Sequence, residues 1–96
     1  MKTVEERVRA GAALLDARRP GWRAEVDAAS LDIHSGWRCV LGQLYGDYPT
    51  GKAVLGLDGD ARQYGFTTSY DLSAVKMADD LDALTAAWQR YLTAAE

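Results

Sequence analysis

The sequence has one cysteine, two prolines and no long hydrophobic run, and each shortage excludes a class of protein. With Cys39 alone, the chain can form neither an intramolecular disulfide nor a zinc motif built on cysteine pairs. No segment approaches the roughly 18 apolar residues of a membrane-spanning helix, and the charged N-terminus lacks the apolar core of a signal peptide. We therefore expect a cytoplasmic protein with no membrane segment.

The sequence also lacks an excess of positive charge. Eleven Lys and Arg face fourteen Asp and Glu, a net charge of −3 at pH 7, whereas nucleic-acid-binding domains usually carry a basic excess. The 48% hydrophobic and 26% charged residues are typical of a folded globular protein. We expect one domain, residues 1–96, that buries roughly 60–65% of the surface of its unfolded chain.

Helical periodicity dominates the chain and predicts an all-α fold of four to five helices. The clearest helix spans residues 3–19, where Val4 begins an apolar stripe with the period of an α-helix. Thr3 is the expected cap of this helix, and Pro20 follows its end. Within residues 22–33, a weaker pattern predicts a short helix followed by an extended segment, in which Leu31 and Ile33 can pack as the chain leaves the helix.

A central helix is predicted over residues 35–48, with Ser35 as its cap. Its core-facing side is expected to carry five large side chains, Trp37, Leu41, Leu44, Tyr45 and Tyr48. Cys39 is expected on the opposite side. Gly42 and Gly46 lie one helical turn apart and indicate that another backbone approaches the helix closely.

The C-terminal half is predicted to hold turns, one extended segment and a last helix. Residues 49–66 are expected to form turns around one short helix, with Asp58 as a cap. Residues 67–72 are the only segment that favours a short strand. The last helix is expected over residues 79–93, with three aspartates at the positive end of its dipole, Asp79, Asp80 and Asp82.

The stretch "GDYPTGKA" contains the G-x-x-x-x-G-K pattern of phosphate-binding loops. Such a loop needs a buried strand before it and a Ser or Thr after the lysine, but a predicted helix precedes Gly46, and Ala53 follows Lys52. Pro49 also removes one amide from the phosphate cradle. We therefore expect Gly46, Pro49 and Gly51 to be turn residues, Lys52 to lie in solvent, and no nucleotide cofactor to bind.

Two further groups of residues have the composition of a chemical site. His34 and Cys39 could act as a base and a nucleophile, but their spacing does not enforce contact, and a lone cysteine is commonly a buried apolar residue. Two acidic groups could hold a metal, Asp58 with Asp60, or Asp79 with Asp80 and Asp82, but neither follows the ligand spacing of a calcium loop. We predict no catalytic residue, no metal site and no enzymatic activity.

The N-terminal part of the chain supports an alternative function. Five arginines there could contact a phosphate backbone, namely Arg7, Arg9, Arg18, Arg19 and Arg23. Glu5, Glu6 and Asp16 interleave with them and cancel much of their field. A nucleic-acid-associated regulator is therefore the alternative, while a salt-bridged helix surface is the favoured interpretation.

The aromatic residues favour a protein-binding or self-associating module. Three Trp, five Tyr and one Phe are many large rings for 96 residues, and a domain of this size can hardly enclose all of them. Tyrosine is favoured at protein interfaces because its ring buries apolar area while its hydroxyl stays hydrated. The predicted interaction residues are Tyr48, Tyr64, Tyr70 and Tyr91.

The segments "RVRAGAALLDARRPGW", "CVLGQLYGDY" and "LTAAWQRYL" together resemble a group of small proteins encoded by actinobacteria and their bacteriophages. The resemblance covers most of the chain, is most specific from Cys39 to Tyr48, and fits residues 67–78 least. No activity, catalytic residue or ligand is established for that group. The resemblance implies only a context, in which a phage accessory factor binds a host protein in the host cytoplasm, with a homo-oligomer as a further expectation.

Overall fold

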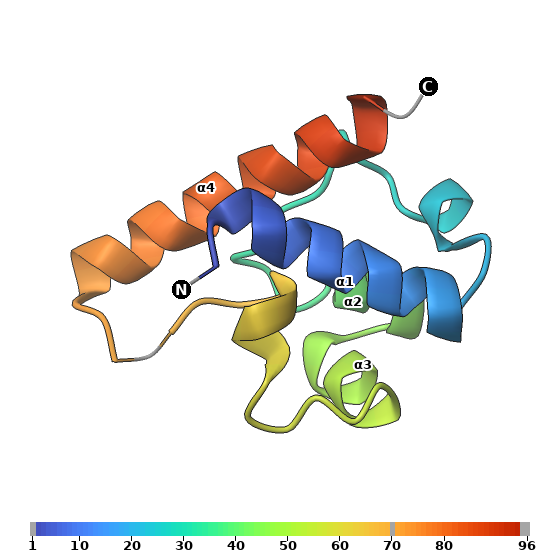
Figure 1. The fold of residues 1–96 in the computed structure, drawn as a ribbon, viewed down its shortest axis with the longest axis horizontal. Coiled ribbons are helices and arrows are strands. Elements are labelled where there is room, and N and C mark those ends of the chain that lie inside the picture. Colours follow the sequence, from blue (N-terminus) through green and yellow to red (C-terminus); the bar gives the residue numbers. More distant parts are fainter. Residues whose placement is uncertain (1, 70, 95–96) are drawn as a thin grey trace.

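The computed structural model describes residues 2–69 and 71–94, and in this part of the chain every regular element is a helix. Four α-helices and two short 3-10 turns follow one another in the order α1 (Val4–Arg18), η1 (Trp22–Glu25), α2 (Val40–Tyr45), α3 (Tyr48–Val54), η2 (Ala61–Tyr64) and α4 (Ala74–Ala94). Figure 1 shows α4 on one side of α1, with η2 and α3 on the other. The predicted all-α fold is confirmed.

The first helix begins and ends close to where the local sequence predicts. The Thr3 hydroxyl accepts a hydrogen bond from the Glu6 amide at 3.1 Å, and Glu6 Oε1 accepts one from the Thr3 amide at 2.9 Å. This reciprocal pair is a capping box, and its hydrogen bonds lower the pKa of Glu6. Beyond Arg18, Gly21 adopts a φ of 86°, a left-handed conformation suited to glycine that turns the chain into η1.

The last helix begins at Ala74 rather than at Asp79. The Ser73 hydroxyl accepts a hydrogen bond from the Lys76 amide at 3.3 Å, and the residues that follow contain no helix breaker. The first turn of α4 therefore contains no acidic residue. The interpretation of three aspartates as charges at the helix start is wrong, and it concerned Asp79, Asp80 and Asp82.

Among residues 2–69 and 71–94, no helix is both long enough and apolar enough to cross a membrane. This holds even for α4, the longest helix, with 21 residues.

The core is built around two tryptophan rings. Trp22 and Trp88 are 1% and 0% exposed, with centroids 6.0 Å apart and planes at 88°, the edge-to-face arrangement that aromatic pairs favour. Phe66 stacks on Trp88 at 5.6 Å and 14°. Trp22 Nε1 donates to Asp16 Oδ1 at 2.8 Å, and Trp88 Nε1 donates to the Gly65 carbonyl at 2.7 Å. Both buried N–H groups therefore have partners.

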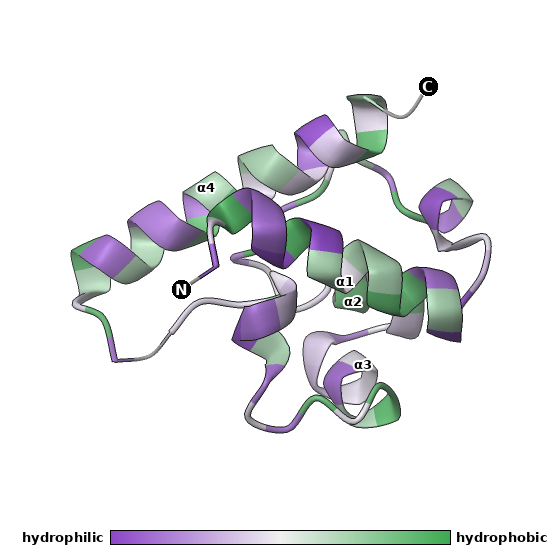
Figure 2. Ribbon diagram, in the orientation of Figure 1, coloured by the Kyte–Doolittle hydropathy of each residue, from purple (hydrophilic) through white to green (hydrophobic). Residues whose placement is uncertain are grey.

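The hydrophobic second half of α1 lies against this core (Figure 2), and Ala12 and Leu15 there are fully buried. Gly11 permits the close contact, because a Cβ at this position would lie 2.1 Å from the Tyr64 carbonyl oxygen and 3.0 Å from the Trp88 ring. The missing side chain thus allows α1 to pack on η2 and α4 together.

The prediction of one continuous helix over residues 35–48 is wrong. Residues 32–39 form a loop, α2 begins only at Val40, and Gly46 ends α2 with a φ of 97° before Asp47 caps α3. Among the described residues, no atom lies within 4 Å of where a Cβ of Gly46 would be. Gly46 is therefore a helix terminator, not the site of close backbone approach that was expected.

Two local contacts explain why α2 does not extend back to Ser35. Cys39 has an extended backbone, and its Sγ accepts a hydrogen bond from the Gly42 amide at 3.2 Å, so Cys39 caps α2 instead. Gly42 then packs on the preceding loop, since a Cβ there would lie 2.5 Å from Trp37 Cα and 2.6 Å from the Gly36 carbonyl oxygen. The close approach predicted for Gly42 is confirmed.

Two residues of the predicted helix are placed differently as a result. Trp37, expected on the core-facing side, is 71% exposed, while Cys39, expected on the opposite side, is 2% exposed. Both follow from the loop, because side chains there do not obey the helical period. The interpretation of Cys39 as a buried apolar residue is confirmed.

The remaining connections are less regular than predicted. Of the short helix expected at the start of residues 22–33, only the η1 turn forms. Leu31 and Ile33 are buried as the chain leaves it, so their predicted packing is confirmed. The residue before η2 is Asp60, and no side-chain hydrogen bond caps this turn, so the prediction of Asp58 as a cap is wrong.

The predicted extended segment is not a strand in the part that the structure describes. Residues 67–69 and 71–72 form bends and irregular chain. Tyr70 lies outside the described residues.

Candidate functional site

The phosphate-loop pattern lies at the junction of two helices. Gly46 ends α2, and Asp47 Oδ1 accepts a hydrogen bond from the Thr50 amide at 2.8 Å as the cap of α3. The hydrogen bonds with Thr50 lower the pKa of Asp47. A carboxylate of the chain therefore already occupies the helix start where a phosphate would bind.

Pro49 and Gly51, expected in a turn, lie inside α3 instead. Pro49 is in the first turn, where its missing N–H costs no hydrogen bond, and Gly51 is buried against α2. Lys52, expected in solvent, is half-buried, with Nζ 3.9 Å from Asp58 Oδ1 and 5.7 Å from the Tyr48 ring centroid. The pattern thus serves packing between α2 and α3.

His34 and Cys39 are not joined by a hydrogen bond in the described part of the chain. His34 Nε2 lies 2.7 Å from Asp82 Oδ1, while Cys39 Sγ contacts main-chain groups of Gly36 and Gly42. Burial raises the pKa of the Cys39 thiol, and a protonated thiol is a poor nucleophile. The geometry gives Cys39 a structural role as the cap of α2.

Three of the five candidate metal-binding carboxylates contact separate partners. Asp80 forms an ion pair with Arg7, Asp58 lies 3.9 Å from Lys52, and Asp82 is hydrogen-bonded to His34. In the two described stretches, 2–69 and 71–94, no three His, Cys, Asp or Glu side chains are grouped so that they could hold a metal ion.

Most of the candidate nucleic-acid-binding arginines donate hydrogen bonds to the protein itself, namely Arg7, Arg18, Arg19 and Arg23. Arg19 bonds Glu25 through two nitrogens at 2.9 and 3.1 Å. The Arg23 guanidinium lies 4.6 Å from the Tyr91 ring centroid and donates to the Tyr91 carbonyl. Arg9 is exposed. At four of the five positions at least one guanidinium donor is thus already bonded within the protein.

The predicted interaction tyrosines lie at the edge of the core. Tyr48, Tyr64 and Tyr91 are half-buried and pack against buried residues, and the Tyr91 ring lies 6.4 Å from that of Trp88. Tyr70 is outside the described residues. A role for these tyrosines in an interface stays a prediction.

Trp37 is the largest side chain that the structure exposes. In the described part of the chain, neither a ring contact nor a side-chain hydrogen bond holds its indole. An open hollow of about 540 Å³ runs along the loop that carries it, and this hollow is lined by Asp32, His34, Ser35, Gly36, Trp37 and Arg38. We call residues 32–39 the Trp37 loop.

Hydrogen bonds within the Trp37 loop fix its backbone. Ser35 Oγ accepts from the amides of Trp37 and Arg38 at 3.3 and 3.0 Å. The Gly36 carbonyl accepts from the Tyr48 amide at 2.6 Å, which ties the loop to α3. The loop is therefore held by the Ser35 hydroxyl and by main-chain groups, and none of these hydrogen bonds involves the indole.

Contacts with α4 hold the other end of the Trp37 loop. The Ile33 amide donates to Thr85 Oγ1 at 3.0 Å, and His34 contacts Asp82 as described above. Together with the Gly42 contact, these bonds attach the loop to α2, α3 and α4.

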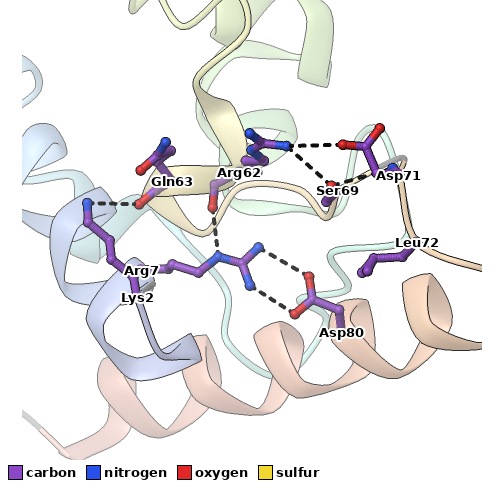
Figure 3. Close-up of a pocket in the computed structure, with 8 residues that line it drawn as sticks. All are labelled: Lys2, Arg7, Arg62, Gln63, Ser69, Asp71, Leu72 and Asp80. Atoms are coloured by element: carbon purple, nitrogen blue, oxygen red, sulfur yellow. Dashed lines mark hydrogen bonds and ion pairs between the residues drawn. The ribbon is translucent and has the colours of Figure 1, made fainter.

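A second feature is a cavity of about 590 Å³ at the start of α1, beside η2 and the first turns of α4 (Figure 3). Its lining is mostly charged or polar and consists of Lys2, Arg7, Arg62, Gln63, Ser69, Asp71, Leu72 and Asp80. We call it the Arg62 cavity.

The floor of the Arg62 cavity is an ion pair between α1 and α4. Arg7 Nη1 and Nη2 donate to the two carboxylate oxygens of Asp80 at 2.9 and 3.1 Å, and the side chains are only 14% and 17% exposed. Arg7 Nε also donates to the Arg62 carbonyl at 2.7 Å, so the guanidinium lies between that carbonyl and Asp80 (Figure 3). Although burial alone would raise it, the pKa of Asp80 is lowered by the hydrogen bonds from Arg7.

Sequence reasoning missed both the Trp37 loop and the Arg62 cavity. The dipeptide Ser35-Gly36 is a turn signal, and it would have placed Trp37 outside a helix. The cavity has no comparable signal, because Arg7 and Asp80 are 73 positions apart in the chain.

No family model, curated protein or solved structure matches the chain. Function is therefore inferred from the geometry of these surfaces.

Proposed function

We propose that the chain is a non-enzymatic protein-interaction module that presents Trp37 to a protein partner. The observation that carries the proposal is an indole 71% exposed on a loop attached to three helices. An enclosed tryptophan buries roughly 150–250 Å². At roughly 25 cal/mol per Å², covering the exposed part of Trp37 would contribute about 3–4 kcal/mol to association.

The rigidity of the Trp37 loop adds to this contribution. Fixing the backbone of one residue costs about 1–2 kcal/mol, and the hydrogen bonds at Ser35 and Gly36 already fix the backbone of the loop before a partner binds. Tryptophan is also among the residues most enriched at the energetic centres of interfaces. An exposed indole on a fixed backbone therefore suits an anchor that enters an apolar pocket of a partner.

The surroundings of Trp37 suit the rim of such an interface. Asp32, His34 and Arg38 line the same hollow, and the first and last of these form an ion pair at 3.5 Å. A polar, solvated rim around an apolar anchor is the usual anatomy of protein interfaces. The idea that the partner is a host protein rests only on the resemblance to actinobacteriophage proteins.

Capture from an actinobacterial lysate tests the proposal. Tagged wild-type protein and Trp37→Ala are immobilised, lysate is passed over both with and without nuclease, and retained proteins are identified by mass spectrometry. We expect one protein to be retained by the wild type in both conditions. Its retention by Trp37→Ala should fall at least about tenfold, because truncating a central aromatic anchor costs about 2 kcal/mol or more.

Val75→Ala is the matched control, since Val75 is 72% exposed on the first turn of α4. This variant should retain the partner as the wild type does. Equal retention by Trp37→Ala, or no retained protein at all, contradicts the proposal. Retention that disappears with nuclease would instead favour the alternative regulator that uses the arginines.

A further inference from the structure

The Arg62 cavity has the size of a ligand site and no role in the interaction proposed above. Its volume of about 590 Å³ falls within the roughly 300–1,000 Å³ typical of small-molecule pockets. Trp37 and its loop are not part of its lining. The proposed interaction through Trp37 therefore does not account for this cavity.

The charge of the lining favours an anion. Three cationic side chains, Lys2, Arg7 and Arg62, face two carboxylates, Asp71 and Asp80, although the whole chain is acidic with a net charge of −3. Arg7 and Asp80 neutralise each other in the floor of the cavity. The charges left to interact with a ligand are those of the other three side chains.

Arg62 has hydrogen-bond donors to spare. In the part of the chain that the structure describes, its guanidinium meets Ser69 Oγ at 3.2 Å and Asp71 Oδ2 at 4.0 Å, both through Nη1. The Arg62–Asp71 pair is at the outer limit of an ion pair, and exposed pairs of this kind contribute little to stability. A guanidinium has five N–H donors arranged to bind a carboxylate or phosphate through two parallel bonds, so such a group can displace Asp71.

Lys2 supplies a second positive charge at the rim. Its Nζ donates to the Gln63 carbonyl at 3.4 Å, a long hydrogen bond, and lies 5.6 Å from the Tyr64 ring centroid. An ammonium group has three donors, so this contact also leaves donors for a ligand. Figure 3 shows the Lys2 ammonium to the left of the Arg7 guanidinium and the Arg62 guanidinium above it.

We propose that the Arg62 cavity binds a small organic anion, whose carboxylate or phosphate group bonds Arg62 and whose remaining part extends over the Arg7–Asp80 pair towards Lys2. The floor is suited to this because the paired charges, held by four hydrogen bonds of Arg7, do not have to rearrange when the ligand enters. Leu72 offers an apolar wall for the carbon part of the ligand.

Backbone-amide NMR titration with three probes tests this site. Inorganic phosphate, citrate and glucose 6-phosphate are added separately, and sodium chloride at matched ionic strength corrects for general salt effects. We expect saturable shifts at the amides of Arg62, Gln63 and Leu72 with at least one organic probe, and weaker binding of inorganic phosphate. Whether citrate or glucose 6-phosphate binds more tightly distinguishes a carboxylate ligand from a phosphorylated one.

Two variants distinguish binding of the probe in the Arg62 cavity from its non-specific attraction to positively charged side chains. Arg62→Gln should weaken the best probe by about tenfold or more, because a hydrogen bond to a charged group is lost. Arg9→Gln removes an exposed arginine that does not line the cavity and should leave affinity unchanged. Both side chains lie at the surface, so both variants should fold.

Three results would overturn the inference: no saturable amide shift with any probe, an equal loss of affinity in Arg62→Gln and Arg9→Gln, or amide shifts of the same size with sodium chloride alone. Trp37→Ala should bind the best probe like the wild type, so failure of this inference is distinguishable from failure of the proposed protein-interaction function.

Discussion

The tryptophans of this small domain lie in two opposite environments. Trp22 and Trp88 are buried, pack edge to face, and donate their N–H groups to Asp16 and Gly65. Trp37 is 71% exposed, and hydrogen bonds of Ser35, Ile33 and Gly36 hold its loop without help from the indole. The comparison shows that the buried tryptophans stabilise the core through their rings, whereas the Trp37 loop is held by other residues and leaves its indole exposed.

The largest effect should come from removing a core ring. Trp88→Ala loses the contacts with Trp22 and Phe66 and leaves a cavity, so we expect the free energy of unfolding to fall by about 3–5 kcal/mol, measured by urea denaturation. Trp88→Phe keeps a ring beside Phe66 but loses the hydrogen bond to Gly65, and should cost about 1–3 kcal/mol. If the free energy of unfolding of Trp88→Ala falls by less than about 1 kcal/mol, the aromatic rings contribute little to the stability of the core.

The ion pair next to the core should contribute less than the rings. Asp80→Asn leaves the mostly buried Arg7 charge without its counter-ion. We expect the free energy of unfolding to fall by about 2–3 kcal/mol at neutral pH, which lies between the values for exposed and buried ion pairs. Asp79→Asn, on the exposed side of α4, is the matched control and should change stability by less than about 0.5 kcal/mol.

The Asp80 effect should also depend on pH. The pKa of Asp80 is lowered in the folded protein from its ordinary value of 3.8, so the ionised carboxylate stabilises the fold above that value. This stabilisation is lost as pH falls through the folded-state pKa. The difference in unfolding free energy between wild type and Asp80→Asn should therefore be full at pH 7 and shrink below about pH 4. A difference that stays constant down to pH 2 would contradict the ion-pair account.

A methyl group at Gly42 should disturb the Trp37 loop and leave the core intact. In Gly42→Ala the new Cβ would meet main-chain atoms of Gly36 and Trp37 at 2.5–2.6 Å, which cannot rotate away. We expect the free energy of unfolding to fall by about 1–2 kcal/mol, because overpacking costs about 2–3 kcal/mol, whereas the higher helix propensity of alanine contributes about 1 kcal/mol. Amide shifts should change in residues 32–39 and stay constant around Trp88; the reverse pattern would refute the assigned contact.

The smallest effect on stability should come from the exposed tryptophan. Trp37→Ala removes a ring that is 71% exposed, so the free energy of unfolding should change by less than about 0.5 kcal/mol. The measurement is the same urea titration as for Trp88→Ala. A loss near that of Trp88→Ala would place Trp37 in the core and remove the basis of the proposed interaction.

Local sequence patterns predicted those elements whose ends are set locally. The signals at both ends of α1 are short: Thr3 and Glu6 mark its start, and Pro20 and Gly21 follow its end. The local sequence therefore predicts α1 almost to its ends. The start of α4 was missed because the helix continues back to Ala74, with Ser73 before it, through residues without an acidic side chain, and the prediction was guided by the charges at Asp79 and Asp80.

The two sites differ in how far the sequence could predict them. The helical period of α2 extends back through Trp37, but the local Cys39 cap and the contact of Gly42 with Gly36 end the helix, and Ser35-Gly36 is a turn signal in the sequence. The Arg62 cavity depends instead on the Arg7–Asp80 pair, whose members are 73 positions apart and share no local pattern.

The most direct test of the account is iodide quenching of tryptophan fluorescence in the native protein. Iodide is charged and quenches rings at the surface, so the wild type should show a quenchable fraction that comes from Trp37. In Trp37→Phe, which keeps Trp22 and Trp88, that fraction should disappear until the protein is unfolded. If Trp37→Phe is quenched as strongly as the wild type, the exposed tryptophan is not Trp37, and the proposed anchor is wrong.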